Sequence, residues 1–309
     1  MEQPKISIVI PLYNEESGFE TLVERITQVM DSSSLPIQTV LVNDGSADNT
    51  PYLMKLVSDR DKRFRSVFLS RNHGHQIAVS AGMHYAEGTE AIMIIDGDLQ
   101  DPPELMTEFY AKIAEGYDVV YAVRQKRKEG MMLKLAYWLY YRLQRAVSYY
   151  NIPIDSGDFC MITTRVRDIM TSMPEESRYL RGMRSWVGFK QFAFSYERSN
   201  RFAGESKYTL SKLMQLAFNG IFNFTRFPIT MMYRIGIFTL LLSILYIIRL
   251  FYLRFIGADL PQGYITLIFS ISFFSGVQLI SLGLIGEYVF RTYSQVRQRP
   301  LFIIDKIIN

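Results

Sequence analysis

The stretch at residues 91–104, AIMIIDGDLQDPPE, decides which fold the chain is expected to adopt. Its apolar run at residues 92–95 is too short for a free helix and is rich in β-branched residues, so it predicts a buried strand. The run ends in Asp96, Asp98 and Asp101. Carboxylates at the end of a buried parallel strand lie where open α/β sheets bind their ligands. The stretch therefore predicts a mostly parallel α/β sheet with a ligand site at one edge.

The spacing of Asp96 and Asp98 allows two interpretations. On an extended backbone both side chains point the same way, because strand side chains alternate. Such carboxylates repel each other unless a hard cation lies between them and a phosphorylated ligand. Alternatively, the segment is an acidic turn in which Asp101 caps the next helix, since Asp-Pro-Pro-Glu is a good helix start. The position after a buried strand favours the metal site.

Composition limits the class of protein. The 309 residues suffice for one large domain or two smaller ones, and most of the hydrophobic excess follows Pro228. A net charge of +4 argues against a nucleic-acid binder. Cys160 is the single cysteine, which excludes an internal disulfide and a multi-cysteine metal site. No signal peptide is expected, because residues 1–5 lead directly into a strand-like run.

Strand-like and helix-like segments alternate before residue 125. Such alternation implies right-handed crossovers and a mostly parallel sheet. The polar turns after the first, second and fourth strands should then lie along one edge. Further short strands are expected at residues 161–163, after an acidic turn, and at residues 301–308. The main expected strands are residues 5–11, 38–42, 65–69, 92–95 and 119–123, and the expected helices are residues 19–30, 75–85 and 103–115.

The chain has three histidines, and two of them form a His-Gly-His sequence at His73 and His75. This pattern resembles a metal-binding cluster. However, no carboxylate or cysteine accompanies the histidines at ligand spacing. The sequence therefore favours a polar loop here.

Two long apolar segments lie near the C-terminus, at residues 235–253 and 260–286. Each is long enough to cross about 30 Å of hydrocarbon, whereas a pair of buried globular helices is the less favoured alternative. Arg249 lies near one end of the first segment and can snorkel. The positive-inside rule places the α/β domain and both termini in the cytoplasm. The outer flanks carry Arg226, Arg234, Arg291, Arg297, Arg299 and Lys306.

Residues 131–150 and 208–227 are apolar, aromatic and punctuated by basic side chains. Such amphipathic helices suit a membrane interface, although a core helix has a similar pattern. The basic run RQKRK at residues 124–128 is typical of a solvated loop. A soluble α/β domain joined to membrane spans suggests chemistry between a soluble phosphorylated donor and a lipid.

Six short motifs carry a resemblance to a known family. The chain resembles glycosyltransferase family 2 enzymes of the GT-A fold, of the polyprenyl-phosphate glycosyltransferase type. This type includes dolichyl-phosphate mannose synthase and the more similar bactoprenol glucosyl transferases. The resemblance covers nearly the whole chain. The motifs are IPLYNE at residues 10–15, VNDGS at 42–46, SRN at 70–72, DGDLQDPP at 96–103, DSGDF at 155–159 and AGESKY at 203–208.

The resemblance implies roles for individual residues. The nucleotide would be held by Pro11, Tyr13, Glu15, Asp44, Asp96 and Gly97. Mg²⁺ or Mn²⁺ on the donor diphosphate would be held by Asp98 and Gln100, with Asp96 beside them. Catalysis would involve Asp158, near the reacting centre, and the phosphate-binding residues Arg124, Arg201 and Lys207. Relatives often have arginine at the position of Cys160, so this chain departs from the family pattern there.

The resemblance implies an enzyme of the inner (plasma) membrane with multi-pass topology. It would transfer a hexose, with inversion, from a nucleotide sugar to undecaprenyl phosphate. UDP-glucose is the preferred donor and GDP-mannose the alternative. A homo-oligomer, such as a tetramer, would assemble through the membrane helices. A processive polysaccharide synthase and a non-catalytic scaffold are weaker alternatives. The implied domains are a catalytic domain at residues 1–230, a transmembrane hairpin at 231–290 and a cytoplasmic tail at 291–309.

Overall fold

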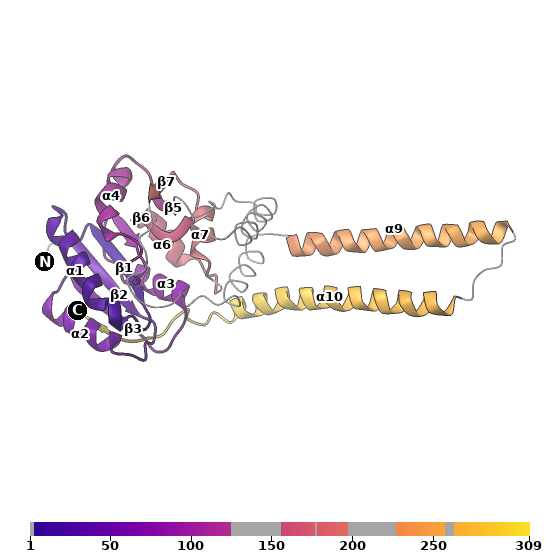
Figure 1. Ribbon diagram of the computed structural model, residues 1–309, viewed down its shortest axis with the longest axis horizontal. Coiled ribbons are helices and arrows are strands. Elements are labelled where there is room, and N and C mark those ends of the chain that lie inside the picture. The colour runs from indigo at the N-terminus through magenta and orange to yellow at the C-terminus, as the bar shows by residue number, and fades with distance from the viewer. Residues whose placement is uncertain (1–2, 125–155, 177, 197–226, 257–262) are drawn as a thin grey trace. The chain divides into compact units, whose positions relative to one another are not determined.

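The computed structural model describes residues 3–124, 156–176, 178–196, 227–256 and 263–309 (Figure 1). The chain divides into two compact units. The first, here called the sheet unit, contains Met1–Ala146, Tyr150–Ala217 and Pro300–Asn309. The second, here called the helical unit, contains Val147–Tyr149 and Phe218–Arg299. The two units are described separately below.

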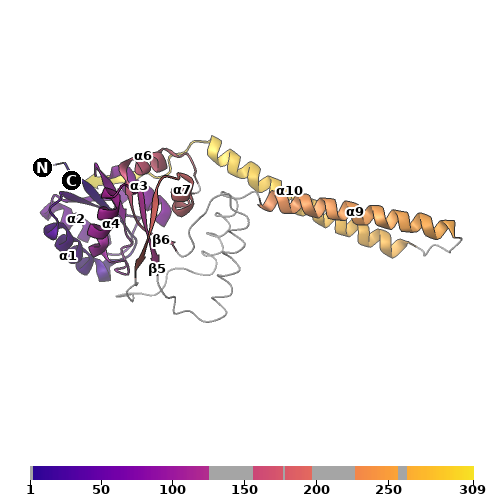
Figure 2. The ribbon, with the colours of Figure 1, turned by 90° about the horizontal axis from the view of Figure 1, so that it is seen from above.

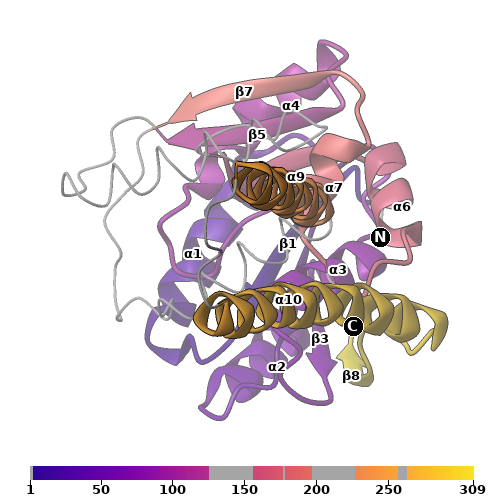
Figure 3. The same cartoon turned by 90° about the vertical axis from the view of Figure 1, so that its right-hand side faces the viewer.

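The sheet unit is built on one mixed sheet with the strand order β7-β5-β6-β4-β1-β2-β3-β8. β7 and β8 are its two edges (Figure 3). All described strands run in one direction except β6 and β8, which are antiparallel to their neighbours. The expected mostly parallel α/β fold is thus confirmed. The strands are β1 Ile6–Leu12, β2 Ile37–Asn43, β3 Phe64–Leu69, β4 Ala91–Ile94, β5 Val119–Arg124, β6 Ser156–Thr163, β7 Gln191–Tyr196 and β8 Ile304–Ile308.

Helices cover both faces of this sheet (Figure 2). One face carries α1 (Glu16–Ser32), α2 (Thr50–Arg60) and the short helix η1 (Pro103–Leu105) followed by α4 (Met106–Ala114). The other face carries α3 (His75–Tyr85), α6 (Thr164–Ser172) and α7 (Leu180–Trp186). Apolar strand residues therefore alternate between two cores, one under each helical layer.

The small residues of α3 let this helix lie directly on the sheet. A Cβ atom on Gly82 would meet Val9 Cγ1 at 2.3 Å and Val42 Cγ2 at 3.0 Å. Any larger side chain would push the helix away from β1 and β2. The close packing fixes the first turn of α3, which begins at His75, relative to the strands beside it.

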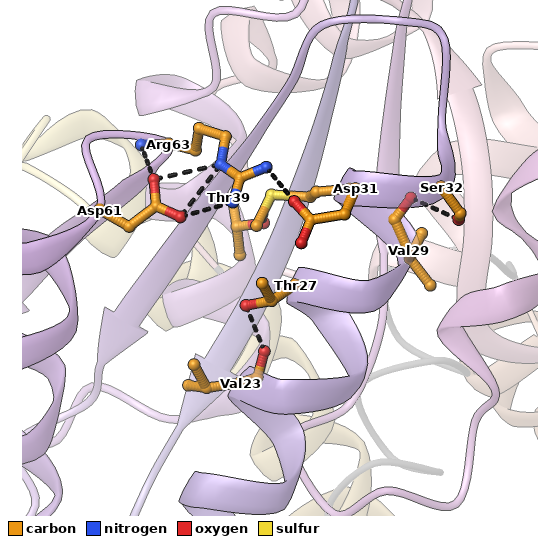
Figure 4. Close-up of polar contacts among 9 residues, drawn as sticks. Val23, Thr27, Val29, Asp31, Ser32, Thr39, Asp61 and Arg63 are labelled. Atoms are coloured by element: carbon orange, nitrogen blue, oxygen red, sulfur yellow. Dashed lines mark hydrogen bonds and ion pairs between the residues drawn. The ribbon is translucent and has the colours of Figure 1, made fainter.

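Arg63 ties α1 to the connection between α2 and β3 (Figure 4). Its Nη1 donates to Asp31 Oδ1 at 2.6 Å, and its Nε donates to both carboxylate oxygens of Asp61 at 3.0–3.1 Å. Arg63 directly precedes β3, so these contacts lie at the amino end of that strand. They are therefore remote from the carboxyl ends of the parallel strands.

The helical unit consists of α9 (Phe227–Phe255) and α10 (Tyr264–Val296). The helical character expected for both apolar segments is confirmed, and α10 continues ten residues past the expected end at residue 286. Among the described residues, Phe269–Val296 is the one helical segment long and apolar enough to cross a membrane. A shorter apolar segment, Met231–Tyr246, lies within α9.

After α10 the chain returns to the sheet unit. β8 pairs antiparallel with β3, and Ser70 N donates to Ile303 O at 2.9 Å. Asn309 Nδ2 donates to the carbonyl oxygens of Lys62 and Phe64. The strand expected within residues 301–308 is confirmed. Part of the expected tail at residues 291–309 thus forms the last strand of the sheet.

Candidate active site

Polar turns follow β1, β2 and β4, which are parallel neighbours in the sheet. Because parallel strands end at the same edge, these turns meet there, as the sequence predicts. The turns after β1 and β2 are tied together by hydrogen bonds. Asn14 N donates to Ser46 Oγ at 3.0 Å, Ala47 N to Asn14 Oδ1 at 2.8 Å, and Glu15 N to Thr50 Oγ1 at 3.0 Å.

The residues expected to hold the nucleoside lie on this cross-linked edge. Pro11 is within β1, and Tyr13 and Glu15 follow it. Tyr13 has 41% of its surface exposed, which is high for an aromatic side chain beside a core strand. Asn14 has a positive φ of 53°, a conformation that asparagine tolerates better than most residues. The turn thus presents an aromatic ring at the sheet edge.

Asp44 anchors the loop that follows β3. Its two carboxylate oxygens accept the backbone N–H groups of His73, at 2.7 Å, and Gly74, at 2.9 Å. Burial raises the pKa of Asp44, and these hydrogen bonds oppose the shift. The carboxylate is thus engaged with the loop that leads into α3. A contact with the nucleoside, as the resemblance implies, stays a prediction.

Gly45 lets the β2 and β3 loops pass each other closely. Its φ of +66° is in the left-handed region, and a Cβ atom there would lie 2.5 Å from Asn72 N. Asn72 Nδ2 also donates to Asp44 O at 3.1 Å. Glycine is therefore required here for two reasons, the backbone conformation and the lack of space.

The acidic stretch after β4 is a turn and not an extended strand. β4 ends at Ile94, and the chain turns at Gly97 and Asp98. The condition under which Asp96 and Asp98 would point the same way is therefore not met. Asp98 Oδ1 accepts the N–H of Gln100 at 3.1 Å, which closes the turn. A Cβ atom on Gly97 would lie 2.5 Å from Leu12 Cδ2, so the turn passes directly over the end of β1.

Asp101 does not cap the next helix, contrary to the alternative drawn from the sequence. Its side chain is 2% exposed, and the hydroxyl of Tyr196 donates to its Oδ1 at 2.6 Å. Tyr196 ends β7, so the contact joins the acidic turn to the far part of the sheet. The described helix begins at Pro103 without a side-chain cap. Asp101 is a buried structural carboxylate.

A cluster of charged side chains surrounds Asp158. The sequence predicts a turn at this residue, but Asp158 lies within β6, which begins at Ser156. It accepts hydrogen bonds from Arg181 Nε at 2.9 Å, Arg181 Nη2 at 3.3 Å and Gln76 Nε2 at 3.0 Å. Burial alone would raise the pKa of Asp158, but Arg181 and His75 outweigh it and hold the pKa well below the usual range. The carboxylate is therefore fully ionised at neutral pH.

His75 joins this cluster to the acidic turn. Its Nε2 lies 3.5 Å from Asp158 Oδ2 and 3.6 Å from Asp96 Oδ1. Burial lowers the pKa of His75, but the two nearby carboxylates raise it by more. The pKa is therefore raised overall, to about 9. His75 begins the helix expected at residues 75–85, and it lies near carboxylates from β6 and from the turn after β4, which spacing along the sequence does not reveal. Arg181 and Gln76 were missed for the same reason.

The residues after β4 are suited to a divalent cation by their chemistry. Asp96, Asp98 and Gln100 offer carboxylate and amide oxygens, the hard donors that Mg²⁺ and Mn²⁺ prefer. Among the described residues, no group of three or more histidine, cysteine or acidic side chains is arranged as a complete metal site. A cation here would therefore need further ligands from a bound phosphate or water, as is usual for Mg²⁺.

Several expected residues lie outside the described part of the chain. These are Arg201, Lys207 and the two segments at residues 131–150 and 208–227. Arg124 is the last residue of β5, and its backbone pairs with Tyr196 of β7. Cys160 follows two residues after Asp158 on β6 and is buried. Burial raises the pKa of the Cys160 thiol.

Comparison with known proteins decides the family. Residues 7–169 match the model of the glycosyl transferase family 2. The chain belongs to this family. The family 2 match extends from β1 through β6 into α6, and so includes His75, Asp96, Asp98 and Asp158.

Relatives of this family 2 glycosyltransferase match it over nearly its full length. An uncharacterised glycosyltransferase, YkcC of Bacillus subtilis (strain 168), is 42% identical and the alignment covers 97% of this chain and 93% of YkcC. The bactoprenol glucosyl transferase of Shigella phage SfV is 34% identical, with 97% and 98% covered. The solved mannosyl-3-phosphoglycerate synthase of Rubrobacter xylanophilus has a TM-score of 0.49 at 17% identity, with 70% of this chain and 71% of that chain covered.

Proposed function

We propose that this glycosyltransferase transfers a hexose from a nucleotide sugar to a polyprenyl phosphate at the cytoplasmic face of a membrane. The observation that carries the proposal is the full-length match to proteins named bactoprenol glucosyl transferase, which extends through both α9 and α10. UDP-glucose is the proposed donor, because those relatives are named as glucosyl transferases. GDP-mannose is the alternative donor.

The donor site is proposed along the edge formed by the turns after β1, β2 and β4. Tyr13 would stack on the base, with Pro11 and Glu15 beside it, and Asp44 would hold the loop that closes the site. Asp98 and Gln100, with Asp96 nearby, would hold Mg²⁺ or Mn²⁺ on the diphosphate. A divalent cation bound there would act as a Lewis acid on the leaving group.

The acceptor phosphate does not require a strong general base to become a nucleophile. A phosphate monoester has a second pKa near 6, so most of it is a dianion at neutral pH and its oxygen can attack the anomeric carbon directly. Single in-line attack inverts the configuration, so an α-linked donor would give a β-linked lipid-phosphate sugar. Arg124, Arg201 and Lys207 are proposed to offset the charge of the two phosphates.

Asp158 is proposed to position the reacting groups and not to accept a proton. Its hydrogen bonds to Arg181 and Gln76, together with His75, keep the carboxylate ionised and oriented. A carboxylate whose pKa lies well below the usual range is a weak base. Asp158→Asn should therefore lower kcat by a factor that stays constant between pH 6 and 8.5. Recovery of the variant as the pH rises would instead indicate a general base.

A membrane hairpin is proposed for α9 and α10. The chain leaves the sheet unit before α9 and returns to it after α10, because β8 pairs with β3. Two ends on the same side require an even number of crossings, so the candidate span in α10 implies a second span in α9. Arg234 near the start of α9 and Arg297 just after α10 support a cytoplasmic location for these ends, by the positive-inside rule.

The test is transfer by the purified full-length protein in liposomes that contain undecaprenyl phosphate. A panel of radiolabelled nucleotide sugars should give one lipid-linked product, which EDTA should abolish and Mg²⁺ or Mn²⁺ restore. The anomeric configuration of the product, measured by NMR, should be β. Failure of every donor would refute the proposed function. Full activity after exhaustive chelation would refute the metal, and an α-linked product would refute single displacement.

A further inference from the structure

The His75 side chain lies close to carboxylates from both halves of the proposed active site. Asp96 follows β4 on the donor side, and Asp158 lies within β6 on the side where the acceptor is proposed to react. The imidazole Nε2 lies 3.6 Å from the first carboxylate and 3.5 Å from the second. One nitrogen atom therefore links two acidic groups that are 62 residues apart in sequence, at positions 96 and 158.

We propose that His75 is a positioning residue that sets the distance between Asp96 and Asp158 and thereby aligns the donor with the acceptor. The inference rests on the proposed function of this site. Two carboxylates without a shared partner repel each other and would separate. The imidazole lies between them, with Nε2 at 3.5 Å and 3.6 Å from the two carboxylates, and so limits that separation.

The backbone around His75 is fixed on both sides. On the loop side, Asp44 accepts the N–H groups of His73 and Gly74, the two residues before it. On the helix side, Gly82 packs α3 against Val9 of β1. The His75 side chain is 31% exposed, so most of its surface is covered by the surrounding elements. A helix start held this rigidly is suited to positioning groups, because small shifts of reacting groups cost large factors in rate.

The other contacts of Asp158 allow a positioning role of His75 to be distinguished from a purely structural role. Without His75, Asp158 retains the two hydrogen bonds from Arg181 and the one from Gln76. Gln76 is itself fixed, because its Oε1 accepts the N–H of Leu180 at 2.8 Å. Loss of the imidazole should therefore leave β6 and α7 in place. The loss of the imidazole should, however, change the distance between Asp158 and Asp96.

The test compares two amides that differ in reach. His75→Gln can place its amide nitrogen near the position of Nε2, whereas the shorter His75→Asn reaches only the position of Nδ1. We expect His75→Asn to lower kcat about 100-fold while KM for the nucleotide sugar changes less than about threefold. His75→Gln should recover most of the lost kcat. Both variants should unfold within a few degrees of the wild type.

Arg63→Gln is the matched control, because it removes a multidentate ion pair at the amino end of β3, remote from the site. Its kcat should equal that of the wild type. Wild-type kcat in His75→Asn would overturn the positioning role. So would equal losses in His75→Asn and His75→Gln, or a loss of kcat matched by losses of donor binding and thermal stability. An inactive wild type would refute the proposed function instead, so the two failures are distinguishable.

Discussion

At the residue scale, Gly45 determines how the β2 and β3 loops meet. Gly45→Ala adds a Cβ atom 2.5 Å from Asn72 N and also strains a φ of +66°. Gly116→Ala is the matched control, because Gly116 has a φ of +89° but nothing within 4 Å of its Cβ position. The control should lose about 1–2 kcal/mol of unfolding free energy from backbone strain alone. Gly45→Ala should lose more, and calorimetry should also show weaker UDP binding, because the Asp44 loop must shift. Equal stability losses with unchanged UDP binding would contradict this account.

Single residues were predictable from the sequence where their partners lie nearby in the chain. The turn residues 43–50 and the acidic stretch after β4 were identified because turn and strand patterns are local. His75, Gln76 and Arg181 were not, because their shared partner Asp158 is brought to them by the order of strands in the sheet. Local spacing contains no information on such contacts.

At the element scale, the turn after β4 contains two carboxylates with different roles. Asp101 is a buried structural carboxylate, and Asp98 is the proposed metal ligand. Tyr196→Phe removes the hydroxyl that donates to buried Asp101, which should cost about 1–3 kcal/mol of unfolding free energy. It should leave the dependence of rate on Mg²⁺ concentration unchanged. Asp98→Asn should do the reverse, raising the Mg²⁺ needed for half-maximal rate at least about tenfold with little loss of stability. Thermal unfolding and metal titrations of both variants check the prediction. A shifted Mg²⁺ dependence in Tyr196→Phe together with a loss of stability in Asp98→Asn would refute it.

The turn is held by elements that sequence patterns did not connect to it. Leu99 has a φ of 62° yet keeps its side chain buried, a strained conformation for a leucine. Arg25 of α1 pairs with Glu104 at 2.7 Å and donates to Leu99 O at 3.4 Å. β1 to β5 were predictable because apolar β-branched runs mark buried strands. The start of β6 was not, because Ser156, Gly157 and Asp158 resemble a turn.

At the scale of the whole molecule, the pairing of β8 with β3 predicts the membrane topology. A reporter inserted at residue 261, between α9 and α10, should be outside the cytoplasm. A reporter fused after residue 309 through a flexible linker should be inside, as should one at the N-terminus. Protease protection in sealed vesicles measures each position. A reporter at residue 261 on the same side as the termini would exclude a hairpin that crosses the membrane.

The pairing of β8 with β3 also sets the order in which the protein matures during translation. β3 emerges from the ribosome early, but β8 is synthesised only after α10, more than 200 residues later in the chain. Until then β3 is an open edge, and unpaired edges are templates for pairing with other chains. Contacts at such sequence separation also form slowly. Synthesis of the two long helices therefore precedes completion of the sheet, so a nascent chain stalled within α10 would expose an aggregation-prone edge.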